Sequence, residues 1–248
     1  MQGPLVSVIV PAFNEEETIE DVLTRVQEVL ESERLPCEVI VVDDGSTDRT
    51  KELASRCNAI VLSNTTNRGK GCALRKGFKH ASGDIIVTMD ADGSHDPKDI
   101  TRLMMPILGG ADIVLGSRFA DDQGKASTTR FNVLGNMLIN LAIMLMTGKY
   151  VSDSQTGFRA FKKEAMQEIE VESKGYQVET EMTVKTLRNG SVIREVPIKI
   201  KERLNGHTHL DPLLDGLRIL RTLLWASVTD QHTTELSHTN QAANRGRE

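Results

Sequence analysis

Two carboxylates one residue apart, Asp90 and Asp92, are the sharpest candidates for chemistry in this 248-residue chain. They directly follow residues 84–89 (DIIVTM), an apolar run that is typical of a buried strand. Carboxylate oxygens are ligands that Mg²⁺ and Mn²⁺ prefer, and Mg²⁺ commonly takes further ligands from water and substrate phosphates. The pair therefore predicts a divalent-metal site that would hold a diphosphate.

Four further polar clusters follow apolar runs in the same way. In an open parallel sheet, ligands bind beyond the carboxyl ends of the strands, so all five clusters are expected at one edge. The alternative is that each cluster only makes a turn, but a polar cluster after every strand favours a binding site. The four clusters are residues 11–15 (PAFNE), 43–46 (DDGS), 67–71 (NRGKG) and 116–118 (GSR).

The elements that must position these clusters alternate between strand and helix over the first 117 residues. The strands are short runs rich in Val and Ile, and the helices repeat apolar residues at spacings of three and four. This alternation predicts a mostly parallel sheet covered by helices on both faces. Ser46 or Thr47 is the expected N-cap of the second helix. The predicted strands are residues 5–10, 38–42, 59–62, 84–89 and 112–116, and the predicted helices are 16–31, 47–56, 70–81 and 97–108.

The pattern is less regular after residue 117. Residues 121–129 are predicted to form a polar loop, and residues 229–248 are polar, without periodicity, and predicted to be disordered. The elements expected between them are helices over 132–146, 178–188 and 211–227, a turn with a short strand over 152–162, and an alternating strand over 191–201.

Composition excludes several classes of protein. Acidic residues outnumber basic residues 35 to 30 and aromatic residues make up only 4%, so no nucleic-acid partner is expected. Three cysteines without a CxxC pair favour a reducing compartment. The chain does not open with a secretory signal, and its longest apolar stretch, residues 133–147, is shorter than the roughly 20 residues that span a bilayer. We therefore expect a protein that does not cross a membrane.

The motifs VSVIVPAFNEE, VVDDGSTDRT, NRGKG and MDADGSHDP, in this order and spacing, resemble the family 2 glycosyltransferases of the GT-A fold. The later motifs GSRF, DSQTGFRAF, EVPI and ERLNGHTHL narrow the resemblance to the polyprenyl-phosphate (dolichyl-phosphate) glycosyltransferases, over about residues 5–225. The resemblance implies an α/β fold: a GT-A (Rossmann-like), mostly parallel sheet covered by helices, with a C-terminal acceptor-side extension of amphipathic helices. It implies one domain over residues 1–228, with a nucleotide-sugar half (1–117) and an acceptor half (118–228), before the tail 229–248.

The same resemblance implies roles on the donor side. Asp90 and Asp92 would face the metal and the diphosphate, with Ala91 packing on the ribose. Ser94 stands where mannosyl enzymes often carry a third metal ligand, commonly Gln, and a serine hydroxyl would bind directly or through water. Asp43 would either support its loop in binding or only stabilise a turn. The residues implied to border the nucleotide are Pro11, Phe13 and Glu15 at the base and ribose, Val42 and Asp44 at the base, and Gly69, Lys70 and Gly71, where the backbone would approach closely.

Roles on the acceptor side are implied in the same way. Arg118 would receive the acceptor phosphate, and Arg130 is either a second contact to it or a surface arginine. Asp153, which opens an Asp-x-x-Thr-Gly-Phe motif, would lie near the sugar, as a base or in an orienting role. Glu179 and Glu181 either bind sugar hydroxyls or lie on a solvated helix face. The catalytic set implied is Asp92, Arg118 and Asp153.

Two residues near the end of the match would contact the donor phosphates. Arg203 and His209 match an Arg-x5-Lys pair of the family, with His in place of Lys. The charge at position 209 would therefore depend on pH.

The resemblance implies transfer of a single sugar, with inversion, from a nucleotide sugar to dolichyl or polyprenyl phosphate, with Mg²⁺ or Mn²⁺ as cofactor. Asp-Ala-Asp-Gly looks more like the enzymes that use UDP-glucose or UDP-N-acetylglucosamine than those that use GDP-mannose, which stays the alternative. Two interpretations compete with this one. The protein is either a glycosyltransferase with a soluble acceptor or a nucleotide-binding module that has lost catalysis. The intact Asp90 and Asp92 pair and Arg203 argue against the last of these.

A polyprenyl acceptor requires an apolar approach. Apolar residues recur at helical spacing over residues 133–146 and 213–225, where cations flank the second stripe. The two stripes are either core helices or helices that lie in the membrane interface. The second interpretation predicts a cytoplasmic protein associated peripherally with the membrane surface, with help from an oligomer or a separate membrane subunit.

Overall fold

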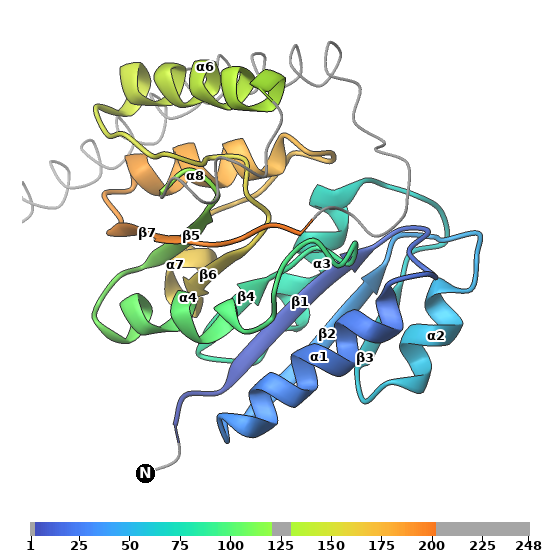
Figure 1. The fold of residues 1–248 in the computed structure, drawn as a ribbon. Helices are drawn as coiled ribbons and strands as arrows, with labels where there is room; N and C mark the ends of the chain where they lie inside the picture. Colours follow the sequence, from blue (N-terminus) through green and yellow to red (C-terminus); the bar gives the residue numbers. More distant parts are fainter. Residues whose placement is uncertain (1–2, 121–129, 202–248) are drawn as a thin grey trace, which may run out of the picture.

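Within residues 3–120 and 130–201, the part of the chain that the computed structural model describes, seven strands form one sheet (Figure 1). The strands are β1 (Val6–Ala12), β2 (Cys37–Asp43), β3 (Ile60–Ser63), β4 (Ile85–Thr88), β5 (Ile113–Ser117), β6 (Arg159–Lys162) and β7 (Ile193–Pro197). Their order across the sheet is β3-β2-β1-β4-β6-β5-β7. The five strands predicted in the first half are all present.

The same two ranges contain seven helices around this sheet. They are α1 (Ile19–Ser32), α2 (Thr50–Arg56), α3 (Lys70–His80), α4 (Asp99–Leu108), α6 (Arg130–Thr147), α7 (Lys163–Gln167) and α8 (Val178–Arg188). The short helix α7 was not among the predicted elements. The predicted helix over 211–227, the loop over 121–129 and the tail over 229–248 lie outside the described residues.

The sheet is parallel except for one strand. β1 pairs in parallel with both β2 and β4, and the pairings of β3 with β2 and of β7 with β5 are also parallel. Only β6 is antiparallel, and it lies between β4 and β5. The carboxyl ends of the other six strands therefore share one edge, and the amino end of β6 joins them there. This confirms the mostly parallel sheet expected from the sequence.

The side chains of β1 alternate between two apolar layers. Val8 and Val10 belong to a core with α1 and α4, whereas Ile9 belongs to a second core with α3 and α8. Because successive side chains of a strand point to opposite faces, a continuous apolar run covers both faces of a sheet. Figure 1 shows α1 and α4 on the near face.

The second helix begins three residues later than predicted. α2 starts at Thr50, and its backbone N–H and hydroxyl both donate to Asp48 Oδ1. The predicted cap at Ser46 or Thr47 is wrong because both residues are engaged elsewhere. Ser46 Oγ accepts from Asn14 N at 3.0 Å, and Thr47 N donates to Asn14 Oδ1 at 2.8 Å. These bonds tie the loop after β1 to the loop after β2.

Helix α6 has an exposed apolar outer side and an apolar inner side that carries two buried asparagines. Asn136 and Asn140 are buried on it together with Ile143, and the helix packs against α8. In Figure 1 it forms a layer apart from the sheet. No helix among the described residues is long and apolar enough to cross a bilayer. The exposed apolar side chains of α6, each 44–77% exposed, are Leu134, Met137, Leu138, Leu141 and Leu145.

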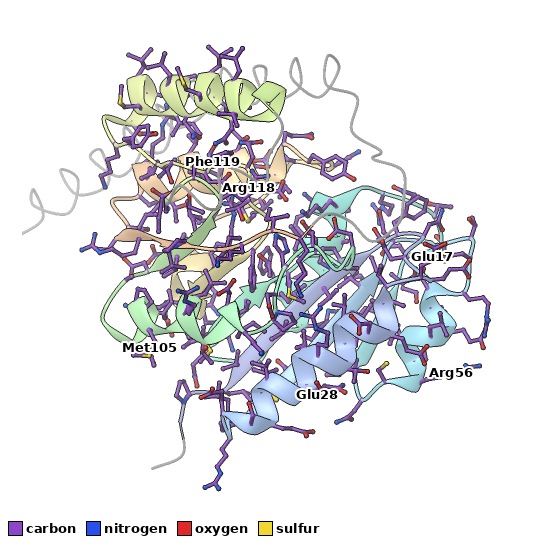
Figure 2. All side chains as sticks on the ribbon, viewed as in Figure 1. Glu17, Glu28, Arg56, Met105, Arg118 and Phe119 are labelled. Atoms are coloured by element: carbon purple, nitrogen blue, oxygen red, sulfur yellow. The ribbon has the colours of Figure 1, made fainter. Side chains whose placement is uncertain are left out.

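The packing of α1 on the sheet yields a direct test of the core. Leu23 is fully buried, so Leu23→Ala should lower the free energy of unfolding by about 2–5 kcal/mol, through lost burial and the cavity left behind. Glu28 lies exposed on the same helix (Figure 2), and Glu28→Ala should change the free energy of unfolding by less than about 0.5 kcal/mol. Urea unfolding followed by circular dichroism measures both values, and equal effects would contradict the placement of α1.

Candidate active site

The loops that follow β2 and β3 are joined through one carboxylate. Asp44, which is buried, accepts hydrogen bonds from the backbone N–H groups of Arg68 and Gly69 and from the Asn64 side chain, at 2.7–3.0 Å. Asp43 Oδ1 accepts from Ser46 N within its own loop. The Asp44 carboxylate therefore holds the loop over 64–69 in place, a structural role that was not anticipated for a residue expected to read the base.

Lys70 links the end of β4 to helix α8. Its Nζ lies 2.5 Å from Asp90 Oδ1 and 2.7 Å from Glu179 Oε1. Burial lowers the pKa of Lys70, but the two carboxylates raise it by more, so the net shift is upward and the lysine is charged. Glu179 is only 3% exposed, and its Oε2 has no hydrogen-bond partner in the described part of the chain. A buried, unpartnered carboxylate oxygen is an acceptor that a ligand hydroxyl could satisfy.

Three glycines allow segments to approach this ion cluster. A Cβ on Gly157 would lie 2.6 Å from Asp90 Oδ2 and 2.8 Å from Lys70 Nζ. A Cβ on Gly69 or Gly71 would lie within 2.4 Å of the backbone oxygen of Lys174 or Ser173, and Gly71 N donates to Lys174 O. Gly69 and Gly71 were expected to make room for a nucleotide. In this structure they make room for residues 173–174, which lead into α8.

Asp92 is held in a tight turn beyond β4. Its Oδ1 accepts from Ser94 N at 3.0 Å and from Ser94 Oγ at 2.6 Å, and it is 4% exposed. Ser94, expected as a metal ligand, thus contacts Asp92 itself. The turn is also joined to the segment after β7, because Ser94 O accepts from Lys201 N at 2.9 Å.

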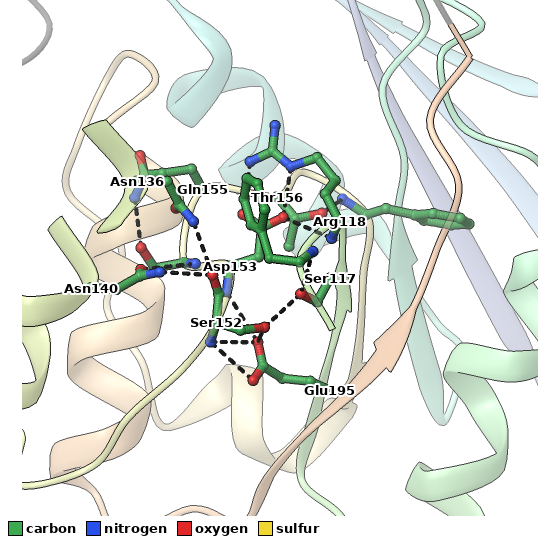
Figure 3. Close-up of polar contacts among 12 residues, drawn as sticks. Ser117, Arg118, Asn136, Asn140, Ser152, Asp153, Gln155, Thr156 and Glu195 are labelled. Carbon is green, nitrogen blue, oxygen red and sulfur yellow. Dashed lines mark hydrogen bonds and ion pairs between the residues drawn. The ribbon is translucent and has the colours of Figure 1, made fainter. Parts of the chain in front are cut away.

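Arg118, at the end of β5, forms a bidentate ion pair with Asp153 (Figure 3). Its Nε lies 2.6 Å from Oδ2 and its Nη2 2.7 Å from Oδ1, and its backbone N–H also donates to Oδ2. Burial lowers the pKa of Arg118, but the Asp153 carboxylate raises it by more. Both oxygens of the fully buried Asp153 are engaged in this pair. The pair favours an orienting role for Asp153 over that of a base.

The segment that carries Asp153 is fixed from several sides (Figure 3). Ser152 N donates to Glu195 on β7, and Ser152 O accepts from the side-chain amides of Asn136 and Asn140 at 2.9 and 2.8 Å. Ser152 Oγ also lies 2.6 Å from the hydroxyl of Ser117, the residue before Arg118. Ser117 lies in the predicted cluster 116–118, whereas Asn136, Asn140 and Glu195 were not predicted, because they come from elements distant in sequence.

Arg159, the first residue of β6, also bonds to the segment that carries Asp153. It is 1% exposed and donates to Ser154 O, to Thr156 O and to the Thr183 hydroxyl on α8, at 2.7–3.0 Å. Burial lowers its pKa to about 10, so the guanidinium is still charged at neutral pH. Arg159 fixes the segment over 152–157 against α8.

Two of the residues expected at the nucleotide belong to the core instead. Val42 has no exposed surface and packs in the layer with α3, so its side chain cannot read the base. Ala91 is buried in the opposite layer, and its carbonyl accepts from Thr18 Oγ1, which leaves little surface for a ribose. Pro11, Phe13 and Glu15 are partly exposed at the end of β1 and stay candidates for the base and ribose.

The alternative prediction that Glu179 and Glu181 lie on a solvated helix face is wrong. Both are buried, because α8 packs against the sheet on this side. Glu181 accepts from the backbone N–H groups of Glu172 and Ser173 and from Lys185. Burial raises its pKa, but these hydrogen bonds lower it by more. Glu181 is thus an anchor for the segment before α8, and only Glu179 faces the ion cluster.

Three expected contacts cannot be placed. Arg203 and His209 lie outside the described residues, and Arg130 begins α6 with a side chain that is not described. The described chain nevertheless ends beside Ser94, two residues before Arg203.

The described donor set fits a hydrated divalent cation. No group of three or more His, Cys, Asp or Glu within residues 3–120 and 130–201 could enclose a metal ion. The pair Asp90 and Asp92 matches a Mg²⁺ site in which water and substrate phosphates complete the coordination. Gly157 keeps the space beside Asp90 free of a side chain. Among the described residues, the centre contains four carboxylates (Asp90, Asp92, Asp153 and Glu179) and three cationic side chains (Lys70, Arg118 and Arg159), so added positive charge would favour a diphosphate there.

Comparisons with known proteins identify the family of the chain. The model of "Glycosyl transferase family 2" matches residues 7–170. The dolichol-phosphate mannosyltransferase of Pyrococcus furiosus is 34% identical over 236 residues, covering 91% of this chain and 66% of that protein. The UDP-N-acetylglucosamine--dolichyl-phosphate N-acetylglucosaminyltransferase of Methanococcus voltae is 33% identical over 222 residues, covering 80% of this chain and 86% of that protein.

A solved structure shares the fold. Glucosyl-3-phosphoglycerate synthase from Mycobacterium tuberculosis, in complex with Mn²⁺, uridine diphosphate and phosphoglyceric acid, superposes with a TM-score of 0.71 and 26% identity. The match covers 91% of this chain and 79% of that one. Since the family model spans more than half of the sequence and the relatives exceed 30% identity, this chain belongs to glycosyl transferase family 2 and has its GT-A fold.

Proposed function

We propose that this glycosyltransferase moves one sugar from a nucleotide sugar to a polyprenyl phosphate, with Mg²⁺ or Mn²⁺ as cofactor. One observation carries the proposal: a carboxylate pair suited to a metal diphosphate, Asp90 and Asp92, shares a sheet edge with a partly exposed arginine suited to a second phosphate, Arg118. Residues 152–157 connect the two, since Asp153 pairs with Arg118 and Gly157 adjoins Asp90. The names of the relatives from Pyrococcus furiosus and Methanococcus voltae support a lipid phosphate as the acceptor.

The donor we favour is UDP-glucose or UDP-N-acetylglucosamine, with GDP-mannose as the alternative. The sequence Asp-Ala-Asp-Gly supports the former, and the relative named a mannosyltransferase supports the latter. The deciding experiment offers the purified protein Mg²⁺ or Mn²⁺, a polyprenyl phosphate and each radiolabelled UDP- and GDP-sugar in turn. Label extracted into the lipid phase from one UDP-sugar supports the proposal, label from GDP-mannose establishes the alternative, and no label from any donor contradicts the lipid acceptor.

On the donor side, the main requirement is to compensate the negative charge that develops on the leaving diphosphate. Departure of the nucleoside diphosphate builds negative charge, and a divalent cation bound by Asp90 and Asp92 would stabilise that charge. Arg203 is proposed to add a second positive charge. The described chain ends at Lys201, whose N–H donates to Ser94 O, two residues from Asp92. Ser94 and His209 stay proposed as further contacts to the metal and the phosphates.

On the acceptor side, positioning is the main requirement. A phosphate monoester is already ionised near neutral pH, so its oxygen can attack the anomeric carbon without a strong general base. Arg118 would hold the acceptor phosphate, while Asp153 fixes the plane of its guanidinium. Glu179 Oε2 would accept a hydrogen bond from a sugar hydroxyl. Attack from the side opposite the leaving diphosphate inverts the anomeric centre.

A soluble phosphorylated acceptor is the second candidate. The similar solved enzyme is named a glucosyl-3-phosphoglycerate synthase and is bound to phosphoglyceric acid, a small soluble phosphate. The outer face of α6 favours the lipid, because five large apolar side chains are exposed on one helix. We propose that this face lies on the cytoplasmic membrane surface, as a peripheral contact that a homo-oligomer or a membrane subunit could reinforce.

Removal of one metal-binding carboxylate should abolish transfer. Asp92→Asn keeps the size of the side chain but removes its charge, so turnover with Mn²⁺ and the preferred donor should fall at least about 100-fold. Asp99→Asn is the matched control, because Asp99 is buried seven residues further on and forms an ion pair with Arg102. Radiolabel transfer measures both variants, and circular dichroism checks their folding. Wild-type turnover by a folded Asp92→Asn protein would contradict the metal-assisted scheme.

Charge on the outer face of α6 should weaken membrane binding. Leu138→Glu combined with Leu141→Glu should lower the partition coefficient onto phosphatidylcholine–phosphatidylglycerol vesicles about tenfold or more, because two apolar side chains no longer enter the interface. Met105→Glu is the control, since Met105 is equally exposed on α4 (Figure 2). Vesicle co-sedimentation gives the coefficients. Equal losses in both proteins, or no binding by the wild type, would contradict the proposed contact.

A further inference from the structure

The inner side of helix α6 carries two buried side-chain amides. Asn136 and Asn140 lie one turn apart on the inner side of α6 and are 6% and 2% exposed. Buried asparagines on a helix that otherwise packs through apolar side chains lower its stability unless their hydrogen bonds are used. Both Nδ2 groups donate to the same atom, Ser152 O. Asn140 Oδ1 also accepts from Ser154 N at 3.3 Å.

Ser152 connects these amides to the acceptor-side ion pair. Its N–H and hydroxyl donate to Glu195 on β7, and Asp153 N donates to the same carboxylate at 3.1 Å. Asp153 is the next residue along, and its two oxygens set the plane of the Arg118 guanidinium. Figure 3 shows the amides of α6 bonded to Ser152, and Asp153, the next residue in the chain, bonded to Arg118.

The pattern of satisfied groups distinguishes this contact from general packing. Asn136 Oδ1 is buried and has no hydrogen-bond partner in the described chain, so an asparagine at this position costs stability relative to an apolar side chain. Only its donation to Ser152 O uses the amide. The bond to Ser152 O is therefore what asparagine at position 136 adds over an apolar side chain, and that bond acts on residues 152–154.

We propose that Asn136 and Asn140 are positioning residues for the acceptor phosphate, acting through Ser152 and Asp153 on the guanidinium of Arg118. The inference rests on the proposed function, in which Arg118 receives that phosphate. Under it, the helix that presents an apolar face to the lipid also sets the geometry of the charge that binds the lipid headgroup. The acceptor then meets one rigid unit, made of α6 and the segment over 152–154.

The test compares Asn136→Leu, Asn140→Leu and the double variant with wild type. Leucine keeps the apolar packing and the helix propensity but removes the amide donors. The matched control is Asn189→Leu, because Asn189 also donates from its side chain to a backbone carbonyl, Glu168 O, but lies exposed at the end of α8. Steady-state transfer to farnesyl phosphate is measured with acceptor and donor varied separately.

In the double variant, we expect the KM for farnesyl phosphate to rise about tenfold while the KM for the nucleotide sugar stays at its wild-type value. Asn189→Leu should leave both unchanged. A purely structural role predicts that both KM values change together, or that neither does, and either outcome would overturn the inference.

A second measurement does not depend on the identity of the acceptor. The Nε–H of Arg118, bonded at 2.6 Å to Asp153, should give a protected arginine signal in ¹⁵N NMR spectra. The signal should shift and exchange faster in the double variant but not in Asn189→Leu. If the wild type fails to use farnesyl phosphate but this change is seen, the proposed acceptor is wrong and the positioning stands. An unchanged Arg118 signal overturns the positioning.

Discussion

The site depends on an imbalance of charge at the carboxyl edge of the sheet. Asp90, Asp92, Asp153 and Glu179 outnumber the cationic side chains that the described residues bring to the same place, and Lys70 and Arg118 are already paired with them. A diphosphate adds further negative charge to a region of low dielectric, where an uncompensated charge is costly. Under the proposed function, a divalent cation bound by Asp90 and Asp92 would compensate the charge of the diphosphate, and the carboxylates that repel the diphosphate would become the ligands of that cation.

One topological feature brings the two halves of this site together. Because β6 runs antiparallel between β4 and β5, its amino end lies where the neighbouring strands end, and the segment before it lies between them. Arg159 pairs in register with Thr88 on one side and with Leu115 on the other. Residues 152–157 therefore reach both Asp90 and Arg118. A further parallel strand in this position would have placed that segment at the opposite edge, away from both charges.

The sequence predicts the parts of the site that follow directly from strands. An apolar run that ends in Asp90 and Asp92 has one possible location in a parallel sheet, and the structure has it there. Side chains whose burial depends on packing between distant elements were not predictable in this way. Val42 faces a helix rather than a ligand, and Glu179 faces Lys70 although its polar helix looks solvated. Asn136, Asn140 and Glu195 bond to residues 152–154, a segment that none of them adjoins in sequence.

The central claim is that a divalent cation bound by Asp90 and Asp92 makes donor binding possible in a carboxylate-rich site. Anomalous X-ray diffraction from crystals grown with Mn²⁺ and uridine diphosphate, collected at the manganese absorption edge, tests it most directly. We predict one manganese peak in contact with a carboxylate oxygen of Asp92 or Asp90 and with the diphosphate. Uridine diphosphate bound at this edge without a manganese peak, or manganese bound elsewhere on the protein, would contradict the claim.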